Sequence, residues 1–137
     1  MTTTDAITAS SLYLDSIDVR FAARIDPGGL ASVHRDPENT GRAIVAINSH
    51  VRFRLNLEDC DTVARAAQLA YERGAAEEIL STDEGFYLYE NLSYPRRMNR
   101  YRLCIGSPLR KTIHASEVAA LAAVLTCFAR HLEAIGA

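Results

Sequence analysis

The stretch VRFRLNLEDCDTVARAAQLAYERG (residues 51–74) contains a predicted strand followed directly by a predicted helix. Its first seven residues alternate between apolar and polar side chains, which is the period of a strand with one buried face. A helix is expected to begin near Asp59, whose carboxylate can cap free backbone N–H groups, and to end at Gly74. The alanines along this helix would let it lie close to a sheet. The stretch therefore predicts an α+β fold.

The two-residue period recurs on both sides of this stretch. Residues 17–25 (IDVRFAARI) alternate strictly, and the turn DPGG follows them with proline and glycine where a hairpin needs them. A long helix is expected from about Ser116 to Glu133. Further strands are expected at LASVH (30–34), RAIVAIN (42–48), EEILS (77–81), FYLYENL (86–92), NRYRLCIG (99–106) and LRKTIH (109–114).

The resulting order, ββββα followed by ββββα, predicts one domain built from two similar units. We expect a flexible N-terminal tail at residues 1–11 and a single α+β domain at 12–137, with pseudo-repeats at 12–74 and 75–137. Sequence identity between the halves is slight, so the repeat is a hypothesis about topology. Two ββββα units predict curved antiparallel sheet with the helices packed on one face and the other face open.

Composition and charge are those of an ordinary soluble globular protein. The chain has 137 residues, of which 48% are hydrophobic and 23% charged, and its net charge is −2. The overall charge gives no indication that the protein binds nucleic acid or a membrane. The three cysteines have no framework spacing, and the N-terminus lacks the basic and apolar regions of a signal peptide. We expect a cytoplasmic protein without membrane contact, since the longest nearly uncharged run is shorter than the ~20 residues of a membrane span.

Strand parity predicts which side chains occupy the open face of the sheet. If the apolar residues of each strand face the helices, six arginines and two tyrosines share the opposite side: Arg20, Arg24, Arg52, Arg54, Arg100, Arg102, Tyr87 and Tyr89. The basic residues are also segregated along the chain. Residues 91–116, which include Arg96 and Arg97, hold six basic residues and no acidic one.

Arginine and exposed tyrosine together suit a single-stranded nucleic acid. Guanidinium groups neutralise phosphates, and each ring offers a stacking platform. The ββββα-ββββα order also resembles, in topology, the Whirly and Pur-type single-strand-binding folds, although none of their sequence motifs is present. We therefore expect a non-enzymatic binding or regulatory module for single-stranded DNA or RNA, with no cofactor. Its candidate binding residues are Arg52, Arg54, Tyr87, Tyr89, Arg96, Arg97, Arg100 and Arg102.

Other interpretations of the same face stay open. Arginines on the solvent side of strands also keep sheets soluble, and exposed tyrosines pair across strands without a ligand. An Arg/Tyr surface is equally typical of protein interfaces, so a protein-interaction or assembly factor is the second hypothesis. A small-molecule enzyme is the third, because the sequence contains no catalytic motif.

The cysteines offer little support for catalysis or metal binding. Cys127 and His131 are four residues apart on the last predicted helix, but nothing positions further ligands beside them. Cys60 falls in the first turn of a helix, where the dipole lowers a thiol pKa, while the neighbouring carboxylates oppose that effect. A slide of 57 residues aligns Cys104 with Ile47. Cys104 and Cys127 are therefore expected in the core, and Cys60 is expected to react fastest with thiol reagents.

The last predicted helix is apolar on nearly every side. Alanines fill most of the surface outside its apolar seam, which consists of Val118, Leu121, Leu125, Phe128 and Leu132. A helix that is apolar all round is buried all round, and in a small domain one flank would stay in water. We therefore expect a homodimer in which this seam is partly intermolecular.

Overall fold

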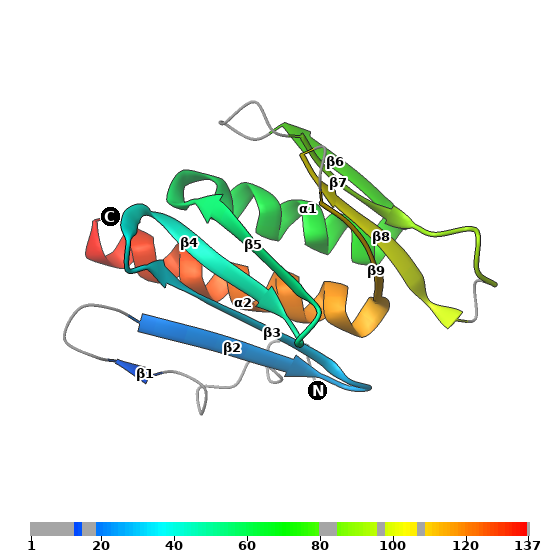
Figure 1. Cartoon of the computed structure of the whole chain (residues 1–137), viewed down its shortest axis with the longest axis horizontal. Helices are drawn as coiled ribbons and strands as arrows, with labels where there is room; N and C mark the ends of the chain where they lie inside the picture. The colour runs from blue at the N-terminus through cyan, green and yellow to red at the C-terminus, as the bar shows by residue number, and fades with distance from the viewer. Residues whose placement is uncertain (1–12, 15–18, 80–84, 96–97, 107–108, 137) are drawn as a thin grey trace.

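The computed structural model describes residues 13–14, 19–79, 85–95, 98–106 and 109–136 (Figure 1). The expected flexible tail at residues 1–11 lies outside the described residues. Arg96 and Arg97, two of the candidate binding residues, also lie outside them.

The described chain forms two antiparallel sheets, each with its strands in chain order. The first sheet contains β1 (Tyr13–Leu14), β2 (Val19–Ile25), β3 (Gly29–Asp36), β4 (Asn39–Ile47) and β5 (Val51–Asn56). A short 3-10 turn (Leu57–Asp59) leads into helix α1 (Cys60–Arg73). The second sheet contains β6 (Ala75–Ile79), β7 (Gly85–Glu90), β8 (Arg100–Ile105) and β9 (Leu109–His114), and helix α2 (Ala115–Ile135) follows. The predicted α+β class is confirmed, with the short strand β1 as an addition.

Helix α1 ends at the predicted glycine, whereas α2 continues two residues beyond the predicted Glu133, to Ile135. Gly74 follows α1 in the left-handed conformation with φ 86°, and its N–H donates to the Ala70 carbonyl at 2.7 Å. This geometry favours glycine because it has no Cβ. Asp59 is the N-cap residue of α1, but its side chain makes no capping hydrogen bond to the helix.

Each helix covers the sheet of the other unit. Helix α2, the last element of the chain, packs against β2 and β3 of the first sheet, whereas α1 packs against β6 and β7 of the second. The two helices also pack extensively against each other, and they lie behind the first sheet in Figure 1. The two halves of the chain are therefore interlocked through their helices.

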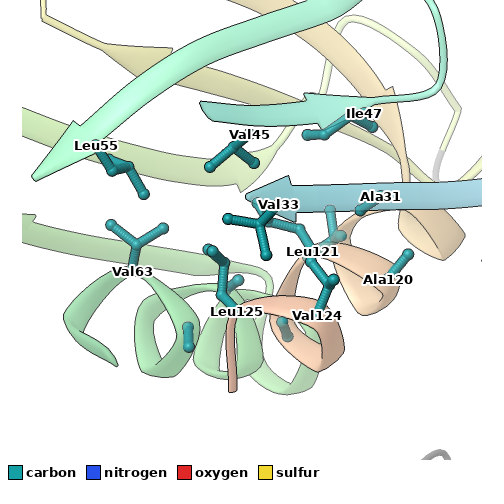
Figure 2. Packing of buried hydrophobic residues seen from close by; sticks show 14 of the residues in the cluster. Ala31, Val33, Val45, Ile47, Leu55, Val63, Ala120, Leu121, Val124 and Leu125 are labelled. Atoms are coloured by element: carbon teal, nitrogen blue, oxygen red, sulfur yellow. The ribbon is translucent and has the colours of Figure 1, made fainter. Parts of the chain in front are cut away.

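The core lies between the first sheet and both helices, as Figure 2 shows. Val33 and Leu55 point from the sheet toward Val63 of α1 and toward Leu121 and Leu125 of α2. All five side chains are buried. Full burial of an aliphatic side chain of this size contributes about 1.5–3 kcal/mol. The alternation that predicted the strands is thus the pattern of residues that meet the helices.

Helix α2 is buried by its own chain. By length and composition its residues 115–134 could cross a membrane, but most of this helix lies inside the fold. Every residue of the apolar seam is buried within one protomer: Val118, Leu121, Leu125, Phe128 and Leu132. The first sheet and α1 cover the flanks that were expected to meet water. The burial of this seam therefore does not require a second copy, and the homodimer stays a prediction.

Candidate functional site

The outer face of the second sheet presents two tyrosines to solvent. Along β7, Phe86 and Leu88 are fully buried against the helices, whereas Tyr87 is 43% exposed and Tyr89 is 40% exposed. This alternation is the period of a half-buried strand. We call this surface the tyrosine face. It comprises Tyr87 and Tyr89 of β7, Arg100, Arg102 and Cys104 of β8, and Arg110 and Thr112 of β9.

The strand register aligns the arginines with the tyrosines. Tyr89 lies opposite Arg102, which in turn lies opposite Thr112 of β9. Tyr87 lies opposite Cys104, and the next residue in that row is Arg110. Each tyrosine therefore shares a cross-strand row with one guanidinium group.

The second sheet also contains acidic residues, in β6 and β7. Glu90 of β7 is the partner of Tyr101, which is buried on the helix side of the sheet. Burial raises the pKa of Tyr101, and the nearby Glu90 and Tyr71 raise it further. In the edge strand β6, Glu77 is the register partner of Tyr87, and Ala75 is that of Tyr89. The strand β8 contributes arginine and no acid to the tyrosine face.

The connection between β7 and β8 exposes apolar side chains beside the tyrosine face. Leu92 is 69% exposed, and Tyr94 and Met98 are also exposed. Asn91 anchors this connection: its buried amide accepts the Ser93 N–H at 3.1 Å and contacts Thr112 Oγ1 at 3.4 Å. The sequence interpretation placed Leu92 in a predicted strand and treated residues 91–116 only as a basic segment, so it missed these exposed apolar side chains. The signal that could have found them is their polar neighbours: Leu92 lies between Asn91 and Ser93.

The eight residues expected on one surface are divided between two sheets. Arg20, Arg24 and Arg52 are exposed on the first sheet. Arg54 is exposed there as well, but its Nε lies 3.2 Å from Asp36 Oδ2. The pKa of Asp36 is lowered, chiefly by the N–H of Glu38 and further by Arg54. Arg54 therefore serves as the partner of a buried carboxylate, a role that strand parity alone could not predict.

The expected burial of the cysteines is wrong. Cys60 is fully buried, and burial together with the charge of Asp59 raises its pKa to about 12. Cys104 is half-buried and lies on the tyrosine face, and Cys127 is also half-buried. The error for Cys104 comes from the odd offset of 57 residues, because a one-residue slip moves a side chain to the opposite face of a strand.

A polar cluster surrounds the start of α2. Glu117 Oε1 accepts the His114 N–H at 2.8 Å, and Glu117 Oε2 lies within hydrogen-bond distance of Asn48 and His50. Burial would raise the pKa of Glu117, but these hydrogen bonds outweigh it and the pKa is lowered. The cluster ties the β4–β5 turn to the start of α2.

The serine and histidine of this cluster do not form a catalytic pair. Ser116 is buried, and its hydroxyl donates to the Pro27 carbonyl at 2.8 Å. His114 Nδ1 accepts the backbone N–H of Ser116 at 3.1 Å and also lies 2.9 Å from the Ser116 hydroxyl oxygen. A nucleophilic serine needs an accessible hydroxyl whose proton passes to a base. Here the hydroxyl is committed to a carbonyl oxygen, so the arrangement caps the helix.

No metal-binding group is found in the described parts of the chain, and a hollow in them is lined by acidic residues. Within them, no group of three or more His, Cys, Asp and Glu side chains could hold a metal ion. The ring of His131 instead packs 5.5 Å from that of Phe21. A hollow of about 480 Å³ is lined partly by Glu58, Asp61 and Glu133. Three carboxylates would repel an anionic ligand from this hollow.

No protein-family model, curated protein or solved structure matches this chain. The resemblance to the Whirly and Pur-type folds therefore rests on the order of elements alone. Any function has to be argued from the side chains of the chain itself.

Proposed function

We propose that the protein binds single-stranded nucleic acid through the tyrosine face and has no enzymatic activity. The observation that carries the proposal is the exposure of Tyr87 and Tyr89 beside an arginine-bearing strand. Arg102 lies directly across from Tyr89, and Arg100 lies two residues before it on the same strand.

The chemistry of the tyrosine face suits both parts of a nucleotide. Every base has a π face, so a tyrosine ring can stack on it, which contributes about 1–3 kcal/mol per base. The guanidinium groups of Arg100 and Arg102 can contact phosphates and release counterions. An anionic strand would be repelled by the acidic residues elsewhere in the chain, so only a face with local positive charge can receive it.

The test is a fluorescence-anisotropy titration with single-stranded oligonucleotides at two salt concentrations. Replacing Arg100 and Arg102 together by Ala should weaken binding and reduce the slope of log affinity against log salt by roughly 1.4, about 0.7 for each lost phosphate contact. Tyr87→Ala should weaken binding with little change in that slope, because stacking releases no counterions.

Arg52→Ala provides the matched control. Arg52 is an exposed arginine on the outer side of β5, in the first sheet. The variant removes one positive charge, whereas the double variant removes two, and it should leave both affinity and salt slope nearly unchanged. An equal loss per removed charge from the two sheets would show that binding is a diffuse effect of charge. An undetectable affinity of the wild-type protein at low salt would end the proposal.

A protein partner is the second candidate, because of the exposed apolar side chains of the β7–β8 connection. Tyrosine, methionine and arginine are enriched at protein interfaces. Under this alternative, replacing Leu92 and Met98 together by Ser should abolish capture of a partner. Ile135→Ser is the control, because Ile135 is 56% exposed at the end of α2. Oligonucleotide binding that survives the Leu92 and Met98 replacements would favour the first proposal.

A further inference from the structure

We infer that the tyrosine face holds two consecutive nucleotides of a stretched single strand, without reading their bases. This inference rests on the proposed function and gives the ligand a length and a conformation. It depends on the spacing of the Tyr87 and Tyr89 rings, on the contact between Tyr87 and Gly85, and on the residues that flank the two tyrosines.

The spacing of the rings selects a single strand. Tyr87 and Tyr89 are two residues apart on one strand, so their backbone positions are about 6.7 Å apart. Neighbouring bases in a duplex strand are only about 3.4 Å apart along the helix axis. Two consecutive bases can therefore reach the two rings only when the strand is stretched and its bases are unstacked.

Gly85 supports the first ring. A Cβ placed on Gly85 would lie 2.7 Å from Cε2 of Tyr87, so the tyrosine ring lies beside the glycine backbone. Tyr87 is 43% exposed, so part of its ring stays open to solvent. The missing side chain at Gly85 thus creates the space that the ring occupies. Gly85 is a positioning residue for the first stacking platform.

The row of rings has two members because the positions on either side of it, Gly85 in β7 and Asn91 just after β7, carry no ring. On one side the row begins at Gly85, which carries no side chain. On the other side it continues to Asn91, which is buried and bonded to the Ser93 N–H and to Thr112. Since the amide of Asn91 is occupied, it is not free to read a base edge. Stacking without such readout tolerates any base.

Arginine lies on only one side of this row. The neighbouring strand β8 runs about 4.8 Å from β7 and contributes Arg102 beside Tyr89, with Arg100 two residues away. On the other side, the register partners in β6 are Glu77 and Ala75. The sugar–phosphate backbone should therefore run over β8 while the bases rest on β7.

The test is a length series of oligothymidines from one to ten nucleotides, followed by chemical-shift titration of the full chain. Affinity should rise about tenfold from the mononucleotide to the dinucleotide, as expected for one additional stacked base. For longer oligonucleotides, affinity should rise only in proportion to the number of nucleotide pairs in the oligonucleotide that can occupy the two rings. A duplex of the same length should bind at least about tenfold more weakly, because its bases cannot reach the rings.

Gly85→Ala changes the position of the Tyr87 ring without removing the ring. The added methyl group displaces the Tyr87 ring, so dinucleotide affinity should fall severalfold while the salt slope stays unchanged. Adding Tyr87→Ala to the Gly85→Ala variant should then cause little further loss of dinucleotide affinity. If Gly85 had only a structural role, the two losses would add. Thermal unfolding of the Gly85→Ala variant establishes that the fold is retained.

Three results would overturn the inference. A similar gain in affinity for every added nucleotide up to ten would show a longer footprint, although the proposed function would stand. Equal affinity for duplex and single strand would show that the spacing of the rings does not select the ligand. If no oligonucleotide of any length binds, the proposed function fails as well.

Discussion

The two sheets repeat one strand order but differ in their outer faces. In the first sheet one outer row consists of Ala22, Ser32, Ala46 and Arg52, so its centre is made of small side chains. In the second sheet the corresponding face presents two half-exposed tyrosines. The two-residue period of a strand determines which face of the sheet a side chain occupies. The residue types on that face determine whether it can bind a ligand.

The first sheet is also more closed on its outer side. Ile44 shares a row with His34 and Arg54, yet only 6% of its surface is exposed. The charge of Arg54 is partly neutralised by Asp36. Both sheets therefore carry accessible arginines, and the second sheet adds the two half-exposed tyrosines.

The largest expected effect comes from a charge placed beneath the first sheet. Leu125→Glu should unfold the protein, because Leu125 is fully buried and an unpaired buried charge costs several kcal/mol. Circular dichroism and sedimentation measure the outcome, with Ile135→Glu at the exposed end of the same helix as control. A folded species of lower mass would instead show that the apolar seam joins two copies.

Thiol labelling compares the accessibility of a buried cysteine, Cys60, with that of Cys104 on the outer face of the second sheet. Cys104 should react fastest with a thiol reagent in the folded protein, Cys127 more slowly, and Cys60 last. Burial raises the pKa of Cys60 to about 12 and also raises that of Cys127. Mass spectrometry of partially labelled protein identifies the modified residue.

The same labelling experiment sharpens the proposed site. A bound oligonucleotide should protect Cys104, which lies opposite Tyr87 in the strand register, and leave the labelling of Cys127 unchanged. Equal protection of both thiols would contradict a ligand confined to the tyrosine face.

A smaller effect is expected where the first sheet meets the start of α2. Glu117→Gln should lower the free energy of unfolding by about 1–3 kcal/mol, because it weakens hydrogen bonds to a buried carboxylate. The folded pKa of Glu117 lies below its ordinary value of 4.5. The carboxylate therefore stabilises the fold above that value, and its contribution is lost as pH falls through the lower folded pKa.

Urea unfolding of the wild-type protein and the Gln variant, from neutral pH to about pH 3, measures this contribution. The difference between them should shrink toward the acidic end. Glu133→Gln is the control, since Glu133 is exposed on the same helix. A difference that stays constant with pH would show that the ionisation of Glu117 contributes nothing.

Sequence periodicity predicted most of the fold. It identified both helices, every strand from β2 to β9, and the outward direction of Tyr87 and Tyr89 along β7. These features depend on the period of local alternation, which the sequence contains directly. The strand β1 was missed because two residues are too few to show a period.

The features that periodicity missed depend on contacts between distant residues. The division into two sheets is a matter of strand pairing, and the hydrogen bond from Arg54 to Asp36 joins two different strands. The position of the Tyr87 ring requires the absence of a side chain at Gly85, and this contact exists only in the folded strand. The candidate site was therefore identified by residue type, while its geometry came from the structure.

The exchange of helices between the two units has a consequence for synthesis. Strands β2 and β3 leave the ribosome long before α2, the element that covers them, has been translated. The side chains of β2 and β3 that face α2 therefore stay uncovered until α2 has been made, and a nascent chain that stops after α1 exposes this apolar surface. Such surfaces are prone to aggregation. The order of the elements thus makes the newly made chain depend on α2 for protection.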